Sequence, residues 1–291
     1  MTFDGSRKGD KDLSKITRTS ICLLATLFAV GIATPAFATN IALTGHDDDF
    51  HCTFGSPAAC TQLAAMLAFA RSGAPTPSLP VLAFDHGTEL TGSLTSLGIA
   101  FTRVDPDVGV PAASLFNVAT FSAIVVASDA TCGGCDNTTV SIANLTAAAA
   151  AIAAFGNAGG GIVGLAGASN ASTYYGFLPA SASGFGSPPS TGYIQTAFGA
   201  SIGIPAVNGD PTHNFFFEPG TGGVAAAYGV VERLGSPTTG TAETIACAGC
   251  LISGGGIIGP GPGAVPEPTS VLLLGTGLIG IACAVRRRLP R

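Results

Sequence analysis

The sequence predicts an α/β fold with a doubly wound, largely parallel sheet. Short apolar runs alternate with segments of helical periodicity, as expected of parallel strands joined by crossover helices. The runs are continuous rather than alternating, which is typical of strands buried on both faces. They lie at residues 40–44, 79–84, 99–104, 121–127 and 161–165.

Each predicted helix has a start or stop signal. Ser56 as N-cap and Pro57 at the first helical position begin the first helix. Its apolar residues recur at i, i+3, i+4 and i+7, which predicts one buried face made of Leu63, Met66, Leu67 and Ala70. Thr88 is predicted to cap the second helix, and the alanine-rich helix at 145–155 is predicted to end at Gly156.

The second half of the body is less regular. Glycine, serine and proline accumulate at 168–189, which predicts a long loop. Its aromatic residues Tyr174, Tyr175 and Phe177 are expected to hold that loop against the body. Later strands, antiparallel at one edge, are predicted at 215–217, 228–232 and 243–247.

Both ends of the chain predict export. Basic residues precede an apolar run at 21–32 and an Ala-x-Ala site that ends at Ala38, as in secretory signal peptides. The predicted order is a signal peptide at 1–38, an α/β domain at 39–252, a Gly/Pro-rich spacer at 253–268, a transmembrane helix at 269–285 and a basic cytoplasmic tail at 286–291.

The C-terminal segment combines three elements in a fixed order. These are the motif Pro266, Glu267 and Pro268, an apolar run, and the cluster Arg286, Arg287 and Arg288. The run is close to the lower limit of length for a helix that crosses a bilayer. Arginines next to its end are expected to stay in the cytoplasm, which leaves the body outside.

This order resembles the PEP-CTERM sorting signal of Gram-negative bacteria. The resemblance implies recognition by an exosortase-type transpeptidase, cleavage near residues 266–268 and delivery to the cell surface or the exopolysaccharide matrix. The implied partners are signal peptidase and the Sec machinery, exosortase, the membrane and exopolysaccharide. The alternative is an ordinary membrane anchor at the tail.

Without its two ends, the chain is strongly acidic. All lysines lie in the export signal, and only three arginines fall in the body, namely Arg71, Arg103 and Arg233. Against 14 acidic residues they give a net charge of −11. So few cations cannot neutralise phosphates, which argues against nucleic-acid binding and docking on anionic lipid. The charge is compatible with divalent cations or with solubility outside the cell.

Six cysteines of the body form three local pairs, namely Cys52 with Cys60, Cys132 with Cys135, and Cys247 with Cys250. An even number in an exported protein favours disulfides. The two C-x-x-C motifs could instead supply the four thiolates of a structural zinc site or take part in redox catalysis.

The alanine-rich helix leads into the stretch GGGIVGLAGAS at 159–169. This resembles the class I glutamine amidotransferase-like fold, particularly its ThuA-like branch, and implies a flavodoxin-like sheet. In that family the strand ends at an elbow that presents a nucleophilic cysteine. Leu165 and Ala166 stand there in this chain, so glutaminase chemistry is not implied.

A polar cluster, His46, Asp47, Asp48, Asp49 and His51, follows the first strand. Ligands gather at the carboxyl ends of parallel strands, so we predict a divalent metal site made of His46, Asp48, Asp49 and Asp85. Asp47 and His213 are the alternative catalytic residues, and His86 is also expected to converge there. The cluster equally fits a solvated turn whose aspartates cap the following segment.

The predicted function is that of an exported surface or extracellular-matrix protein with a non-catalytic binding or structural domain. The alternative is a metal-dependent hydrolase that acts on surface polysaccharide, with a metal-bound water as the nucleophile. A divalent metal ion is the only cofactor that the sequence suggests.

Overall fold

The computed structural model describes residues 38–132, 136–178, 183–209, 212–254 and 256–259. The predicted signal peptide before Ala38, the sorting motif, the transmembrane helix and the basic tail lie outside the described residues. The description below therefore concerns the exported body.

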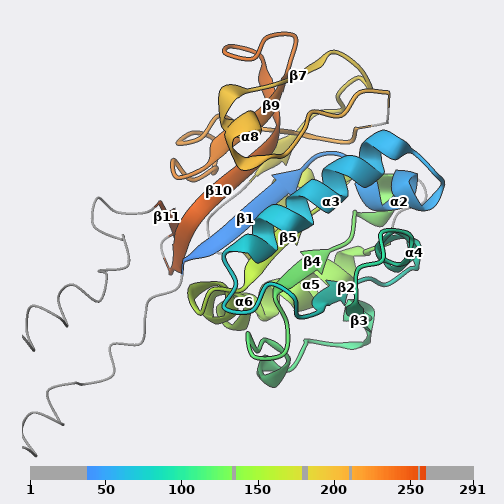
Figure 1. Ribbon diagram of the computed structural model, residues 1–291, viewed down its shortest axis with the longest axis vertical. Helices are drawn as coiled ribbons and strands as arrows, with labels where there is room; N and C mark the ends of the chain where they lie inside the picture. Colours follow the sequence, from blue (N-terminus) through green and yellow to red (C-terminus); the bar gives the residue numbers. More distant parts are fainter. Residues whose placement is uncertain (1–37, 133–135, 179–182, 210–211, 255, 260–291) are drawn as a thin grey trace, which may run out of the picture. The chain divides into compact units, whose positions relative to one another are not determined.

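The described strands form an 11-stranded mixed sheet (Figure 1). Its parallel half has the order β3, β2, β4, β5, β1, with bounds Phe101–Val104, Val81–Phe84, Ala123–Val126, Gly161–Gly164 and Thr39–Thr44. The antiparallel half begins with β10 (Thr241–Ser253), which pairs with β1. It continues through β9 (Gly229–Leu234), β8 (Phe215–Phe216), β7 (Tyr193–Gln195), β6 (Gly184–Phe185) and β11 (Gly256–Ile258).

The structure confirms the α/β class and the parallel strands, but the flavodoxin-like assignment is not confirmed. In a flavodoxin-like sheet the first strand lies between the second and the third strand. In this sheet β1 lies between β5 and β10. The antiparallel strands were predicted only at one edge of the sheet, but they make up a large part of it. The longest of them, β10, is longer than any strand of the parallel half.

Helices cover both faces of the sheet, which gives two cores. One core packs α3 (Pro57–Ser72) and α4 (Glu89–Ser96) against the sheet. The other packs α5 (Thr139–Ala147) and α6 (Ala149–Asn157) against the opposite face. The short α8 (Ala197–Ile202) packs on β9. This is the doubly wound arrangement that the sequence predicts.

The structure confirms the first predicted helix, α3, and its predicted start. Ser56 accepts a hydrogen bond from the backbone of Ala59 (3.4 Å), and the predicted face of Leu63, Met66, Leu67 and Ala70 is fully buried. The helix passes so close to the sheet that a side chain at Gly161 would overlap the backbone of Ala70. Close packing of helix against strand therefore explains this glycine of the Gly-Gly-Gly turn.

Three predicted segments differ from the structure. The predicted helix at 145–155 is two helices, α5 and α6, and Gly156 lies inside α6 rather than ending it. The predicted turn at 45–51 contains the start of α2 (Asp48–Thr53). The predicted loop at 168–189 contains α7 (Ala171–Tyr174) and the 3-10 turns η4 (Ala168–Asn170) and η5 (Tyr175–Phe177).

The aromatic anchors of that loop are as expected, because Tyr174, Tyr175 and Phe177 are fully buried. The Tyr175 hydroxyl donates a hydrogen bond to the backbone oxygen of Thr44 (3.0 Å), at the end of β1. The predicted spacer also begins with structure, since β11 pairs with β10. The remaining short turns are η1 (Pro106–Val108), η2 (Ala113–Leu115) and η3 (Ala130–Cys132).

Within the described part of the chain, no helix by itself has the length and apolarity needed to cross a bilayer. Only α5 and α6 taken together reach that length, and they are bent by 60° relative to each other.

Two of the three predicted cysteine pairs lie in described residues, and both are joined. Cys52 and Cys60 link α2 to α3, with a Cα–Cα distance of 4.6 Å. Cys247 and Cys250 lie in the same strand, β10, with their Cα atoms 6.0 Å apart. Residues three apart normally face opposite sides of a strand, but Gly249 has φ +66° and the pairing with β1 shifts there, as in a β-bulge. The Cys132–Cys135 link lies outside the described residues.

This placement does not favour a zinc site shared by the two C-x-x-C motifs. Cys250 lies opposite Thr39, at the amino end of β1. Cys132 ends η3, which follows the carboxyl end of β4. The two motifs therefore lie at opposite ends of the parallel strands.

Candidate functional site

The polar cluster after β1 is held against a distant segment of the chain. His46 forms an isolated bridge with Thr212, and the backbone N–H of His213 donates to the oxygen of Gly45 (2.8 Å). A side chain at Gly45 would overlap the carbonyl oxygen of Asn214. The glycine therefore allows the two segments to touch, which brings His213 to the cluster.

Asp47 and His213, the alternative catalytic residues, face each other. Asp47 Oδ2 lies 3.1 Å from Nε2 of His213 and 3.3 Å from Nε2 of His51. The Asp47 side chain is almost fully buried, whereas the two imidazoles are about one-fifth exposed, at 20% and 22%. One carboxylate oxygen thus orients two accessible histidines.

His46, a predicted metal ligand, belongs to a different, fully buried network. Its Nε2 lies 3.1 Å from Oε1 of Glu232 in β9. Glu232 also accepts hydrogen bonds from the Gln62 amide, the Thr244 hydroxyl and the backbone of Val207, at 2.8, 2.5 and 2.9 Å. Burial alone would raise the pKa of Glu232, but His46 and these donors outweigh burial, so its pKa lies below the usual value.

Glu243, in the neighbouring strand β10, has the opposite environment. It is fully buried, and neither carboxyl oxygen has a hydrogen-bond partner among the described residues. Burial, and then the charges of Glu232 and Asp48, raise the pKa of Glu243 well above its usual value. This environment favours the neutral form of the Glu243 carboxyl group. Asp48, the second predicted metal ligand, is fully buried close to it.

Asp49 and Asp85 reach the carboxyl ends of β4 and β2. Asp49 accepts hydrogen bonds from the backbone N–H and the hydroxyl of Ser128, at 2.7 and 2.6 Å. Burial raises the pKa of Asp49 to about 7 despite these bonds. Asp85 Oδ2 accepts from the backbone of Thr91 (2.9 Å) in α4. The solvated-turn alternative is thus wrong about exposure, since Asp47, Asp48 and Asp49 are all buried.

Asp136 performs the capping that the sequence assigned to Thr88. The Thr88 side chain makes no cap hydrogen bond. Instead the Asp136 carboxylate accepts from the backbone N–H groups of Thr88 (3.1 Å) and Leu90 (3.0 Å), at the start of α4. Asp136 follows the C-G-G-C loop and carries no local capping signal, so only the fold could reveal this role.

The expected convergence of His86 with the cluster does not occur. His86 Nδ1 turns instead toward Asp105, at 3.0 Å, on the loop after β3. The predicted site residues thus fall into several groups: Asp47 with His51 and His213, His46 with Glu232, Asp49 with Ser128, and Asp85 with α4. The sequence identified Asp47 and His213 as candidate site residues. It did not identify Glu232 and Glu243, because a single glutamate within a strand belongs to no recognisable motif.

The turn after β5 is where the resemblance to the amidotransferases predicts an elbow. Leu165 and Ala166 are fully buried there. Ala168 has φ +43°, and among the described residues it is the only non-glycine with positive φ. In an elbow the strained residue carries the nucleophile. Here the strained position carries a methyl group.

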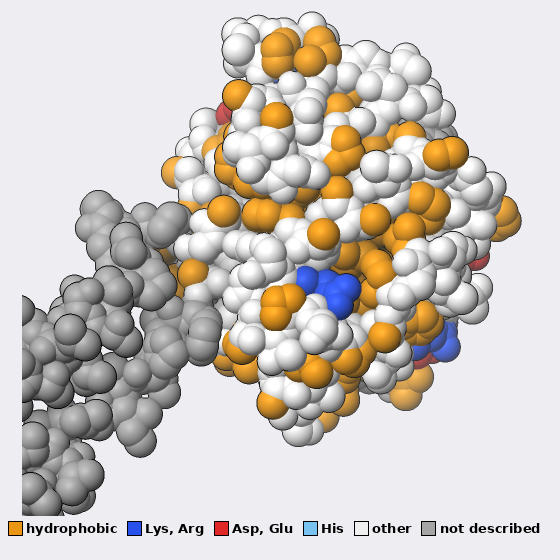
Figure 2. Space-filling view, in the orientation of Figure 1, with side chains coloured by type: hydrophobic (Ala, Val, Ile, Leu, Met, Phe, Trp, Pro, Cys, Tyr) orange, Lys and Arg blue, Asp and Glu red, His pale blue; other side chains and the backbone are white. Residues whose placement is uncertain are grey.

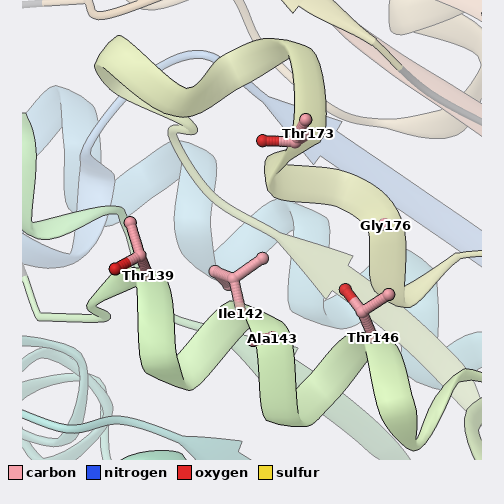
Figure 3. A pocket seen from close by; sticks show the side chains of 6 residues that line it. All are labelled: Thr139, Ile142, Ala143, Thr146, Thr173 and Gly176. Atoms are coloured by element: carbon pink, nitrogen blue, oxygen red, sulfur yellow. The ribbon is translucent and has the colours of Figure 1, made fainter.

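A groove of about 620 Å³ lies between α5 and the segment of α7 and η5 (Figure 3). It is lined by Thr139, Ile142, Ala143, Thr146, Thr173 and Gly176. This lining presents hydroxyl groups and apolar surface but no titratable side chain, so the groove supplies no acid or base for catalysis.

No curated protein and no solved structure matches this chain. The amidotransferase-like resemblance of the body therefore stays a prediction. One family model matches, over residues 264–288, and its description is the PEP-CTERM protein-sorting motif. The protein thus carries at its C-terminus the signal of an exported, membrane-anchored and then processed surface protein, an exosortase substrate.

Proposed function

We propose that this protein is a non-catalytic binding or structural component of the surface or exopolysaccharide matrix of a Gram-negative bacterium. The observation that carries the proposal is the sorting motif at residues 264–288. The environment of the site supports it. Asp49, Asp136 and Glu232 are used to hold Ser128, α4 and His46 in place, and the strained turn after β5 carries only Ala168.

The charge of the body also favours a role in the extracellular space. Its three arginines all make internal hydrogen bonds: Arg71 with the Leu79 oxygen, Arg103 with the His86 oxygen and Arg233 with Glu218. On the face shown in Figure 2, basic side chains occupy only small areas. Such a surface repels polyanions, so we expect its partners to be neutral polysaccharides, proteins or cations.

Replacing Glu267 with alanine in a host that has an exosortase is expected to block processing. The unprocessed chain should then stay in the inner membrane, because its tail helix is not removed. Immunoblots of membrane, surface and matrix fractions measure this. Pro262→Ala is the matched control, since Pro262 lies just before the matched segment. Equal processing of the Glu267 variant and the control would contradict the sorting function.

A second candidate function is a metal-dependent hydrolase acting on surface polysaccharide. The arrangement of His51, Asp47 and His213 favours it, because the two imidazoles are partly exposed and could act on a bound substrate. The predicted metal ligands fit less well. At His46 only Nδ1 is without a hydrogen-bond partner among the described residues, and at Asp49 a metal ion would have to replace Ser128.

The hydrolase function predicts that His213→Ala removes activity on the host polysaccharide while the protein stays folded. Release of reducing ends measures activity, and a urea titration measures folding. Glu218→Ala is the control, because it removes a half-exposed surface carboxylate that pairs with Arg233 and belongs to no candidate site. If wild type and both variants release no sugar, the hydrolase candidate fails and the non-catalytic function stands.

A further inference from the structure

A second cluster of ligand-type side chains lies on the loops after β2 and β3, apart from Asp47 and its histidines. His86 Nδ1 is 3.0 Å from Oδ1 of Asp105 and 3.7 Å from Oδ2 of Asp107. One nitrogen and two carboxylate oxygens thus lie within 4.8 Å of one another. The three side chains are 41%, 29% and 22% exposed, so an ion can reach them from solvent.

Both carboxylates are held in position by other groups. The Asp105 carboxylate accepts a hydrogen bond from the backbone of Asp107 (2.9 Å). The Asp107 carboxylate accepts from the hydroxyls of Thr138 (2.7 Å) and Ser141, the two residues of the capping box of α5. Supporting hydrogen bonds of this kind orient the ligands of metal sites. Here they leave only His86 with freedom to adjust.

The charges around the cluster favour a cation. Arg103 is the nearest basic group, and it donates to the backbone oxygens of Asp85 and His86, at 3.1 and 2.8 Å, rather than to the carboxylates. Directly before His86 lies one more carboxyl group, the fully buried Asp85. The body has a net charge of −11, which raises the local concentration of cations.

We propose that His86, Asp105 and Asp107 bind a divalent transition-metal ion such as Zn²⁺. Imidazole and carboxylate together are typical ligands of zinc, whereas calcium and magnesium prefer oxygen ligands alone. Three protein ligands leave one position of a tetrahedral ion open for water or for a group of another molecule. This site does not depend on the proposed function, because none of its residues belongs to the predicted metal set or to the sorting motif.

Binding should depend on pH because a proton competes with the metal. The hydrogen bond to Asp105 raises the pKa of His86, and Asp107 adds to this, while burial and Arg103 oppose it. The metal needs the neutral imidazole. Zinc affinity is therefore expected to rise as the pH increases, with release of a proton.

The test is titration of the full-length exported chain, purified in mild detergent from a host without exosortase, with zinc chloride in a calorimeter. Wild type should bind one equivalent. His86→Ala should weaken binding by more than about 100-fold, because losing even a supporting partner of a ligand costs about 10- to 100-fold. Asp107→Asn should also weaken binding, while it keeps an oxygen that Thr138 can bond.

His51→Ala is the matched control, since His51 is another partly exposed imidazole beside an aspartate. It should bind zinc as wild type does. Three results would overturn the proposal: no zinc binding by wild type, binding that survives both His86→Ala and Asp107→Asn, or loss of binding only in His51→Ala. The last would assign the ion to Asp47 and its histidines.

Discussion

Replacing Glu232 with alanine is expected to lower the free energy of unfolding by about 3 to 5 kcal/mol, the usual cost of removing one member of a buried ionic network. Glu232 is fully buried and binds His46, Gln62, Thr244 and the backbone of Val207. Alanine leaves Nε2 of His46 and the backbone N–H of Val207 buried without an acceptor, while Gln62 keeps the Pro205 oxygen and Thr244 keeps the Thr44 hydroxyl as partners. These donors come from both halves of the sheet and from α3, so removal of their shared acceptor affects the whole body.

Urea unfolding of the exported chain at pH 7 measures this change. Glu218→Ala is the matched control, because Glu218 pairs with Arg233 at the surface and is about half exposed. Loss of a surface pair should cost at most about 1 kcal/mol. If the two variants are equally stable, the Glu232 network contributes no more than a surface ion pair and the prediction is wrong.

Replacing Glu243 with glutamine is expected to have the opposite effect and to stabilise the protein at pH 7. Burial and the charges of Glu232 and Asp48 raise the pKa of Glu243 in the folded state. The folded chain therefore keeps a proton that the unfolded chain loses near the ordinary pKa of 4.5. The contribution of this proton to the free energy of unfolding is fully present below pH 4.5. It is lost as the pH rises, by up to about 1.4 kcal/mol per pH unit.

Glutamine is neutral at every pH, so the variant avoids this loss. Its free energy of unfolding should exceed that of wild type by an amount on the order of 2 kcal/mol at pH 7. Asp49, whose pKa is raised to about 7, gives the same sign of pH dependence. It is present in both proteins, so the difference between the two profiles isolates Glu243.

Urea titrations of wild type and Glu243→Gln at several pH values between 4 and 8 provide the measurement. The two curves should meet near pH 4 and separate as the pH rises. Curves that run parallel, or a variant that is less stable than wild type at pH 7, would show that Glu243 is ionised in the folded state.

The elements that the sequence located correctly are those with local signals. Ser56, Pro57 and a 3.6-residue period define α3, and a run of β-branched residues defines β4. The helix at 145–155 was placed less well because its alanines carry no period or cap. The capping box at Thr138 and Ser141 set the start of α5, and the chain bends at Ala148, between α5 and α6.

The candidate site was less predictable because its partners are far apart in the chain. His213 approaches Asp47 only because Gly45 lets the segment at 212–214 lie against it. His86 turned to Asp105, since β2 and β3 are neighbours in the sheet while β1 lies beyond β4 and β5. Strand order therefore decided which of the predicted residues meet.

The sequence by itself determined where the protein goes and what class of fold it has. Export and sorting signals, buried strands and capped helices are all patterns of residues that are neighbours in the sequence. Only the tertiary structure decided the chemistry of the polar residues. Glu232 and Glu243 lie in adjacent strands and are both fully buried. The pKa of Glu232 is lowered by donors from four segments, whereas the pKa of Glu243 is raised by burial and by neighbouring carboxylates, because the pKa of a buried group depends on charges and donors that only folding brings together.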